Sequence, residues 1–356
     1  MTSPERPRVA FIYGTREGLR TGIARDLLAE KGAIRDTLMR CEQLIRERLG
    51  WSLHDVCAAE QFASQEVGSP VLTALQLALT DGWRERGVEP DVIAARSGGE
   101  FAAEYTRGTL TLENAVELAC RISDFIRNRR GAGRTLLIRL GLSEAERLQQ
   151  AGPTRFYIVW DVADDRTLIA CETAAIEELK AFFAAHGIEY HGTDSGIAPH
   201  SPLIDEWRTD LLRPLSDATS DPPPIPYYSA SAQGRDEGAS YPMRLWRAMR
   251  EPALTGRMLD SLIADGCTIF LEMSGQPFDA GRIQRRAAIA GKRVITLPRP
   301  RQQPAQAVAT VDGKPILGLS MPRERPFHAV MDEAQEILHR AGVSIRPNRV
   351  AKEIPV

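Results

Sequence analysis

Residues 90–100 read PDVIAARSGGE, an apolar run that ends in one serine and two glycines. Such a run is typical of a buried strand in a parallel sheet, and the residues after Gly99 have a helical pattern. The segment predicts a tight strand-to-helix turn that exposes the hydroxyl of Ser97 as a nucleophile. The amide of Gly98 would then lie at a helix N-terminus as an oxyanion donor. An ordinary turn has the same composition, and Ala95 stands where such elbows usually have glycine, so the segment alone leaves both interpretations open.

The rest of the chain surrounds this segment with the elements of an α/β fold. Apolar runs predict further strands at 9–13, 225–229 and 268–273. Amphipathic patterns predict helices at 18–30, 34–49, 70–86, 101–107, 111–128, 240–249, 253–264 and 327–341. Between 131 and 196 the order changes to strand, helix, strand, strand, helix, strand, which is the ferredoxin-like pattern.

These elements predict three units. A large α/β-hydrolase-like domain with a parallel sheet is formed by residues 8–130 and 197–300. A ferredoxin-like α+β subdomain is inserted at residues 131–196. A C-terminal extension, residues 301–356, carries one helix.

Composition excludes several classes of protein. Lys+Arg (45) and Asp+Glu (47) give the 356-residue chain a net charge of -2, which argues against a nucleic-acid binder. No apolar run reaches the ~18 residues of a membrane helix, and the start of the chain lacks the apolar segment of a signal peptide. Five cysteines without CxxC or zinc spacing predict free thiols, a cytoplasmic location and no metal site.

A nucleophilic serine needs a base, and the six histidines are the candidates. His200 lies in segment 198–202 (APHSP), a loop from which a side chain can reach the top of a sheet. His54 lies near a predicted helix, and two more lie in the C-terminal extension. His186 and His191 flank a subdomain strand without carboxylates at metal-ligand spacing. His200 is therefore the predicted base.

Several segments, in order, resemble the acyltransferase family of polyketide and fatty-acid synthesis, which moves acyl groups from coenzyme A to an acyl carrier protein. Residues 90–100 are similar to the family's P-D-x-V-x-G-H-S-x-G-E, and residues 108–115 (GTLTLENA) to its G-x-L-S-L-E-D-A. Residues 131–134 and 141–146 resemble the start of its subdomain, and 198–202 its catalytic-histidine segment. Residues 250–252 (REP) and 270–277 (FLEMSGQP) resemble its closing elements. The resemblance covers about residues 8–300.

The resemblance implies a role for each residue of the site. Ser97 is the expected nucleophile, His200 the expected base, and the backbone amides of Thr15 and Gly98 the expected oxyanion hole. The family orients its histidine with a backbone carbonyl, which we expect in the loop at residues 273–276. Arg121 falls at the arginine that closes the following helix, where the family pairs it with the free carboxylate of malonyl-type groups. A solvated or salt-bridged helix arginine is the alternative.

Three positions depart from the family pattern. Thr15 replaces the usual glutamine of the first glycine loop, although a threonine amide still serves as a donor. Arg96 replaces the histidine before the serine, and three roles remain open for it: a second contact to a carboxylate, a contact to another polar acyl group, or a pair with Glu100 one helical turn away. Pro199 stands where malonyl-selective members usually have phenylalanine and methylmalonyl-selective members serine, so the usual specificity rule does not apply.

The implied function is that of a discrete, trans-acting, monomeric serine acyltransferase of the malonyltransferase type. It would use a coenzyme A thioester as substrate, no tightly bound cofactor, and a phosphopantetheinylated acyl carrier protein as partner, with no nucleic acid or membrane. Because carrier proteins are acidic, two arginine clusters are candidate docking patches: Arg127, Arg129 and Arg130, and Arg282, Arg285 and Arg286. Three alternatives remain open. They are transfer of an unusual acyl group between carriers, hydrolysis of stalled thioesters, against which Arg121 argues, and an inactive carrier-docking scaffold.

Overall fold

The computed structural model describes most of the chain. The described residues are 6–15, 23–59, 65–128, 131, 133–151, 155–193, 197–213, 225–236, 238, 240–274, 278–292, 294, 310–311, 314–315, 327–343 and 345. All structural statements concern these residues.

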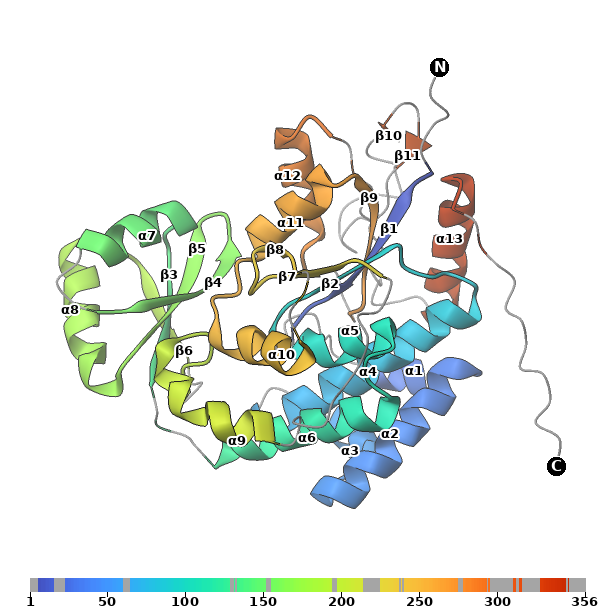
Figure 1. Cartoon of the computed structure of the whole chain (residues 1–356), viewed down its shortest axis with the longest axis horizontal. Helices are drawn as coiled ribbons and strands as arrows, with labels where there is room; N and C mark the ends of the chain where they lie inside the picture. The colour runs from blue at the N-terminus through green and yellow to red at the C-terminus, as the bar shows by residue number, and fades with distance from the viewer. Residues whose placement is uncertain are drawn as a thin grey trace.

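The larger of the two main sheets contains five strands (Figure 1). Its strand order is β8-β7-β2-β1-β9, with bounds β1 (Arg8–Tyr13), β2 (Val92–Ala95), β7 (Tyr227–Ser229), β8 (Gly234–Arg235) and β9 (Cys267–Glu272). The pairs β7–β2, β2–β1 and β1–β9 are parallel, and β8 adds antiparallel to β7. Strands β1 and β2 are buried on both faces, which explains their continuous apolar runs. Ser97 follows β2 and therefore lies at the carboxyl edge of the sheet.

Helices cover both faces of this sheet. Those from the first half of the chain are α1 (Ile23–Leu28), α2 (Ala33–Leu49), α3 (Leu53–Ala58), α4 (Gln65–Glu85), α5 (Glu100–Arg107) and α6 (Leu112–Arg127). Among them α2, α4 and α6 pack against one another. Those from the second half are α9 (Arg208–Leu212), α10 (Tyr241–Arg250), α11 (Thr255–Ala264) and α12 (Ala280–Ile289), and α11 packs on β7, β8 and β9. Short 3-10 turns occupy Ser97–Gly99, Thr173–Ala175 and Pro202–Trp207.

The second sheet belongs to the inserted segment. It contains β3 (Arg134–Ile138), β4 (Tyr157–Ala163), β5 (Arg166–Cys171) and β6 (Tyr190–Thr193) in the order β4-β5-β3-β6, and every pairing is antiparallel. Helices α7 (Leu142–Ala151) and α8 (Ile176–Ala185) lie with it, on the left of Figure 1. This is the strand order of the predicted ferredoxin-like unit, and the α/β fold class is confirmed.

Some elements differ from the sequence prediction. Helix α4 begins at Gln65, five residues before Pro70, so this proline lies inside the helix and not at its start. Helices α3, α9 and α12 were not predicted. Helices α3 and α9 are only six and five residues long, and α12 has a single large apolar residue, Ile283, in its buried face. The first part of the helix expected at 18–30 lies outside the described residues.

A buried ion pair joins the small sheet to the large domain. Asp161 on β4 accepts the N–H groups of Thr255 (2.7 Å) and Gly256 (2.9 Å), so its carboxylate caps the start of α11. The same carboxylate binds the Arg282 guanidinium of α12 at 2.6 Å, and both side chains are buried. In addition, the N–H of Ala253 donates to the carbonyl of Val159 at 2.9 Å. These contacts set how β4 lies against α11 and α12.

The predicted C-terminal helix packs back on the large domain. Helix α13 (Phe327–Arg340) buries Met331 and Leu338 in the main core, and Asp332 pairs with Arg86 at 3.0 Å. Strands β10 (Thr310–Val311) and β11 (Lys314–Pro315) form a two-stranded ladder before it.

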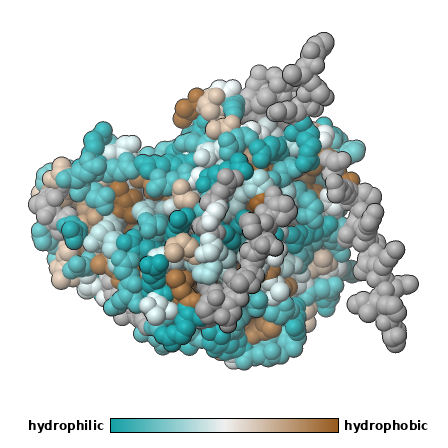
Figure 2. All heavy atoms as spheres, in the orientation of Figure 1, coloured by the Kyte–Doolittle hydropathy of each residue, from teal (hydrophilic) through white to brown (hydrophobic). Residues whose placement is uncertain are grey.

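The visible surface is mostly polar, and the thiols lie in the interior. The face seen in Figure 2 is mostly hydrophilic with scattered apolar spots, and Met39 and Ile289 are exposed apolar side chains. All five cysteines are buried and unpaired. None of the helices in the described parts is long and apolar enough to cross a membrane.

Replacing Asp161 by alanine is expected to destabilise the protein strongly, since the buried Arg282 loses its close counter-ion and keeps only Asp164, at 3.8 Å. Breaking a buried pair costs about 3–5 kcal/mol of the free energy of unfolding, measurable by urea denaturation. Glu189→Ala is the matched control, because Glu189 pairs with Arg139 where both side chains are largely exposed. An exposed pair contributes less than about 1 kcal/mol. Equal losses for the two variants would contradict the assignment.

Candidate active site

The turn after β2 has a strained backbone that presents Ser97. Ser97 adopts a left-handed conformation with φ of 50°, which residues with a Cβ rarely adopt. A Cβ added at Gly99 would lie 2.3 Å from the carbonyl oxygen of Tyr13, so only glycine lets the turn approach β1 so closely. The side-chain amide of Gln76 donates to the carbonyl of Gly14 at 3.0 Å and holds the loop after β1. The predicted tight elbow is therefore present around Ser97.

His200 lies within hydrogen-bond distance of this serine. Its Nε2 is 3.0 Å from Ser97 Oγ, and its Nδ1 is 2.9 Å from the carbonyl oxygen of Glu251. A carbonyl oxygen only accepts, so Nδ1 carries the proton and Nε2 is free to accept from the Ser97 hydroxyl. The backbone N–H of His200 also donates to the carbonyl of Met249 at 2.7 Å, which fixes the loop to the end of α10.

The carbonyl that orients the histidine differs from the predicted one. We expected it in the loop at 273–276, of which residues 275 and 276 lie outside the described residues. Glu251 supplies it instead, because α10 ends at Arg250 and the next carbonyl is no longer committed to a helical bond.

Burial controls the protonation of the pair. Removal of His200 from water lowers its pKa to about 4, and the Glu251 carbonyl opposes this shift only in part. The imidazole is therefore neutral at pH 7 and able to accept a proton.

An apolar cavity of about 110 Å³ opens beside the pair. Ser97, Gly98, Thr15, His200 and Pro199 all contribute to its wall, so the structure brings five of the seven predicted site residues together. The other lining residues are Ser69, Leu72, Phe101, Ile122, Ile126, Ile197, Leu245 and Met249. The described part of the wall contains no Asp, Glu, Lys or Arg side chain.

Arg121 lies away from this cavity. Its guanidinium pairs with Glu117 one turn earlier at 2.6 Å, and its side chain is 48% exposed. The adjacent Ile122 is buried and faces the cavity, together with Ile126 one turn later. Consecutive helix residues are about 100° apart around the axis, and with Ile122 directed to the cavity, Arg121 lies on the flank of α6 where it pairs with Glu117. In the structure Arg121 is therefore a salt-bridged surface arginine, which was the alternative to the carboxylate-binding role.

Arg96 also points elsewhere. Its guanidinium binds Asp279 at 2.7 Å, with both side chains 2% exposed. It lies 5.2 Å from the ring centroids of Trp160 and Phe278, at distances typical of cation–π contacts. It does not pair with Glu100. That carboxyl instead accepts hydrogen bonds from two β7 residues, Tyr227 and Ser229, and burial raises its pKa. Arg96 thus anchors the turn from behind.

The predicted docking patches are largely neutralised. Arg282 is buried on Asp161, and Arg285 and Arg286 pair with Asp164 and Asp260. Arg127 is 52% exposed and pairs with Asp124. Arg129 and Arg130 lie outside the described residues.

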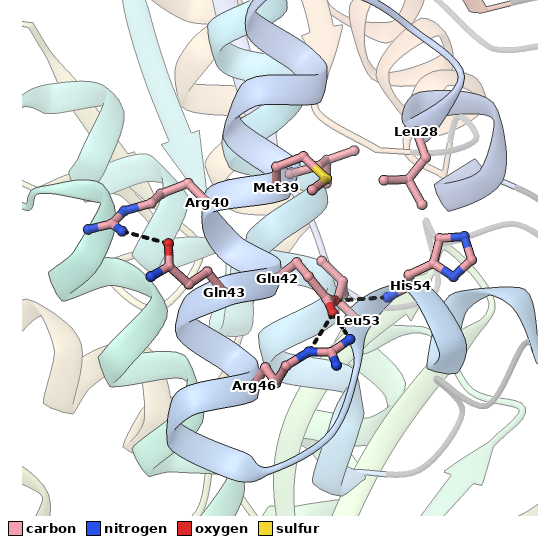
Figure 3. Close-up of a pocket in the computed structure, with 9 residues that line it drawn as sticks. Leu28, Met39, Arg40, Glu42, Gln43, Arg46, Leu53 and His54 are labelled. Carbon is pink, nitrogen blue, oxygen red and sulfur yellow. Dashed lines mark hydrogen bonds and ion pairs between the residues drawn. The ribbon is translucent and has the colours of Figure 1, made fainter.

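A larger groove lies over α1, α2 and α3, away from Ser97 (Figure 3). Its Glu42 is already satisfied by Arg46 (2.6 Å) and by the backbone N–H of His54 (3.1 Å). Figure 3 draws the imidazole of His54 apart from these groups. The described residues that line the groove include no serine or cysteine, so they offer no nucleophile beside a base.

Sequence reasoning missed three contributors to the site. The Glu251 carbonyl has no signal of its own in the sequence, since any residue supplies it. Gln76 lies in an apolar helix, where a lone buried glutamine was a usable signal. Ile122 has no polar signal of its own, and the adjacent Arg121 matched the arginine expected from the family resemblance.

Comparisons with known proteins identify related chains. The family model described as "Acyl transferase domain" matches residues 11–301. The spectinabilin polyketide synthase system protein NorA of Streptomyces orinoci is 28% identical over 295 residues, covering 82% of this chain and 16% of that protein. Erythronolide synthase EryA3 of Saccharopolyspora erythraea is 28% identical over 278 residues, 77% of this chain and 9% of that protein. The chain spans less than a fifth of the length of these relatives.

Solved structures have the same fold. The acyltransferase domain from module 8 of the salinomycin polyketide synthase superposes with a TM-score of 0.76 at 20% identity, covering 95% of this chain and 76% of that one. The acyltransferase domain of PpsC of Mycobacterium tuberculosis gives a TM-score of 0.70 at 24% identity, covering 90% and 93%.

The reactivity of Ser97 is expected to fall at unusually low pH. Protonated His200 cannot accept the serine proton. The rate of labelling by a fluorophosphonate should therefore change little as the pH falls from 7, and should drop only with an apparent pKa near 4. An inflection near 6.5 would contradict the buried, neutral histidine.

Because the unfolded state binds the proton at higher pH, stability should also decline as pH falls from 6.5 towards 4. Fluorescence at each pH must therefore verify folding.

Replacing Arg96 by methionine is expected to cost about 3–5 kcal/mol of the free energy of unfolding, because Asp279 is left buried and unpaired. The double variant Arg96→Met with Asp279→Leu should recover most of this loss, since an apolar pair of similar size replaces both charges. Arg139→Met, which breaks an exposed pair with Glu189, is the control. Failure of the double variant to recover stability would contradict the anchoring role of the ion pair.

Proposed function

The chain belongs to the acyl transferase domain family, and from this membership we propose that it moves an acyl group from a thioester to the phosphopantetheine thiol of an acyl carrier protein. An ester on Ser97 is the intermediate. The observation that carries the proposal is the imidazole of His200, which bridges Ser97 Oγ at 3.0 Å and the Glu251 carbonyl at 2.9 Å beside the cavity.

The first half-reaction forms the acyl-enzyme. His200 Nε2 takes the hydroxyl proton as Ser97 Oγ attacks the thioester carbonyl. The amides of Gly98 and Thr15, both at the cavity wall, hold the negative oxygen. Loss of one such donor typically costs about 3–4 kcal/mol of transition-state stabilisation. The carbon–sulfur bond then breaks, and the departing thiolate takes the proton back from the imidazolium.

The second half-reaction reverses these roles. The thiol of the carrier's phosphopantetheine gives its proton to His200 and attacks the ester carbonyl. The bond to Ser97 Oγ breaks and the serine recovers its proton. A coenzyme A thioester is the proposed donor, and the scheme uses no tightly bound cofactor, since the thioester itself is the activated group.

A backbone carbonyl suits this chemistry as the partner of Nδ1. It fixes the ring and the tautomer without adding a negative charge. The imidazole therefore keeps a low pKa in the buried site and remains a neutral base, not a permanent cation.

The alternatives differ in the fate of the acyl-enzyme. A hydrolase would pass the acyl group to water, and Arg121 does not argue against this fate because it lies outside the cavity. The apolar wall argues against it instead, since water is poorly held there. An inactive scaffold would not need a serine and a histidine in reactive geometry.

Intact-mass analysis with a panel of acyl thioesters and a phosphopantetheinylated carrier tests the proposal. Wild type is expected to gain one acyl mass and to lose it when the carrier is added, with the acyl group appearing on the carrier. Ser97→Ala should form no adduct. His200→Ala should acylate about 10²–10⁴ times more slowly, since a positioned base contributes that factor. Release as free acid would support the hydrolase, and no adduct with any donor the scaffold.

A further inference from the structure

The wall of the acyl cavity carries information about the acyl group. Four helices contribute apolar side chains from different sides: Leu72 of α4, Phe101 of α5, Ile122 and Ile126 of α6, and Leu245 and Met249 of α10. Leu72, Phe101 and Leu245 are each less than 5% exposed. The polar groups on the described part of the wall are hydroxyls, backbone and the neutral His200.

Among the described residues of this wall, a carboxylate would find no counter-charge. Arg121 faces solvent and pairs with Glu117, and Arg96 is buried in an ion pair with Asp279. Arg247 and Arg250 of α10 pair with Asp236 and Asp205. Within the described part of the chain, no arginine or lysine lines the cavity. Transfer of an ionised carboxylate from water to such a site without a partner is strongly unfavourable.

We propose that the cavity selects a short, uncharged, apolar acyl group and discriminates against malonyl-type groups that carry a free carboxylate. The inference rests on the proposed function and names its substrate class. Ile122 is the residue that sets this preference, because its side chain meets the cavity where a cation on α6 would be needed to hold a carboxylate.

The size of the cavity limits the chain length. Its volume is about 110 Å³. A cavity of about 150 Å³ in another protein holds benzene. Groups of the size of propionyl or butyryl therefore fit better than octanoyl.

The primary test compares wild-type acylation by propionyl-, butyryl-, octanoyl-, malonyl- and methylmalonyl-CoA, read as the rate of adduct formation on Ser97. We expect propionyl or butyryl to react about 100-fold or more faster than malonyl, since the carboxylate loses its hydration without gaining a partner. Octanoyl should also be slow. Malonyl reacting as fast as propionyl overturns this inference while leaving the proposed function intact. No adduct with any donor overturns the proposed function itself.

Two substitutions at one position add an independent test. Ile122→Arg is expected to reverse the ratio in favour of malonyl at least tenfold, and Ile122→Ala to raise octanoyl relative to propionyl. Arg121→Ala is the matched control on the neighbouring position, and all ratios should stay within twofold of wild type. Loss of malonyl transfer in Arg121→Ala would overturn the assignment and restore Arg121 as the carboxylate ligand. Ile122→Ala and the wild-type ratios decide the matter where Ile122→Arg does not fold.

Discussion

The left-handed backbone at Ser97 is the constraint on which the site depends. A non-glycine residue with φ of 50° costs about 1–3 kcal/mol and persists only when its surroundings hold it. Gly99 provides the space, because a Cβ at this position would lie 2.3 Å from the carbonyl oxygen of Tyr13. Arg96 provides the anchor, because its buried pair with Asp279 fastens the residue before the serine to the start of α12. Strand β2 on one side and α5 on the other then leave the hydroxyl pointing to the cavity.

Buried charges connect this turn with both sheets. The Arg96 guanidinium also donates to Thr255 Oγ1 at 3.3 Å, and Trp160 of the small sheet donates to the same oxygen at 3.3 Å. Next to Trp160, Asp161 caps α11 and binds Arg282. Burying such charges is costly unless each is paired and hydrogen-bonded, so the cluster tolerates few alternative arrangements. The position of the small sheet and the geometry of the elbow are thereby set by the same group of side chains.

The site combines a dry wall with very few polar atoms. Burial lowers the pKa of His200, and a backbone carbonyl in place of a carboxylate leaves it without a negative neighbour that would raise it again. The imidazole is then a neutral acceptor across the physiological pH range. The same absence of charge on the described wall decides what is accommodated beside Ser97, so that protonation and acyl selectivity have one physical cause, the exclusion of water.

Local patterns in the sequence determined the elements and the reactive pair. The apolar runs of β1 and β2 and the glycines after Ser97 are short-range signals, and so is Thr111, which caps α6 by accepting the N–H of Asn114. The loop around His200 was recognisable by its residues in order. The direction in which a side chain points across a helix was decided only by tertiary packing. Arg121 and Ile122 differ by one position, and burial of the face that contains Ile122 turned the arginine to solvent. The partner of Arg96, Asp279, lies 183 residues away in the sequence, and the partner of His200 Nδ1 is the backbone carbonyl of Glu251. Such choices depend on which surfaces the folded chain removes from water, and no local pattern records them.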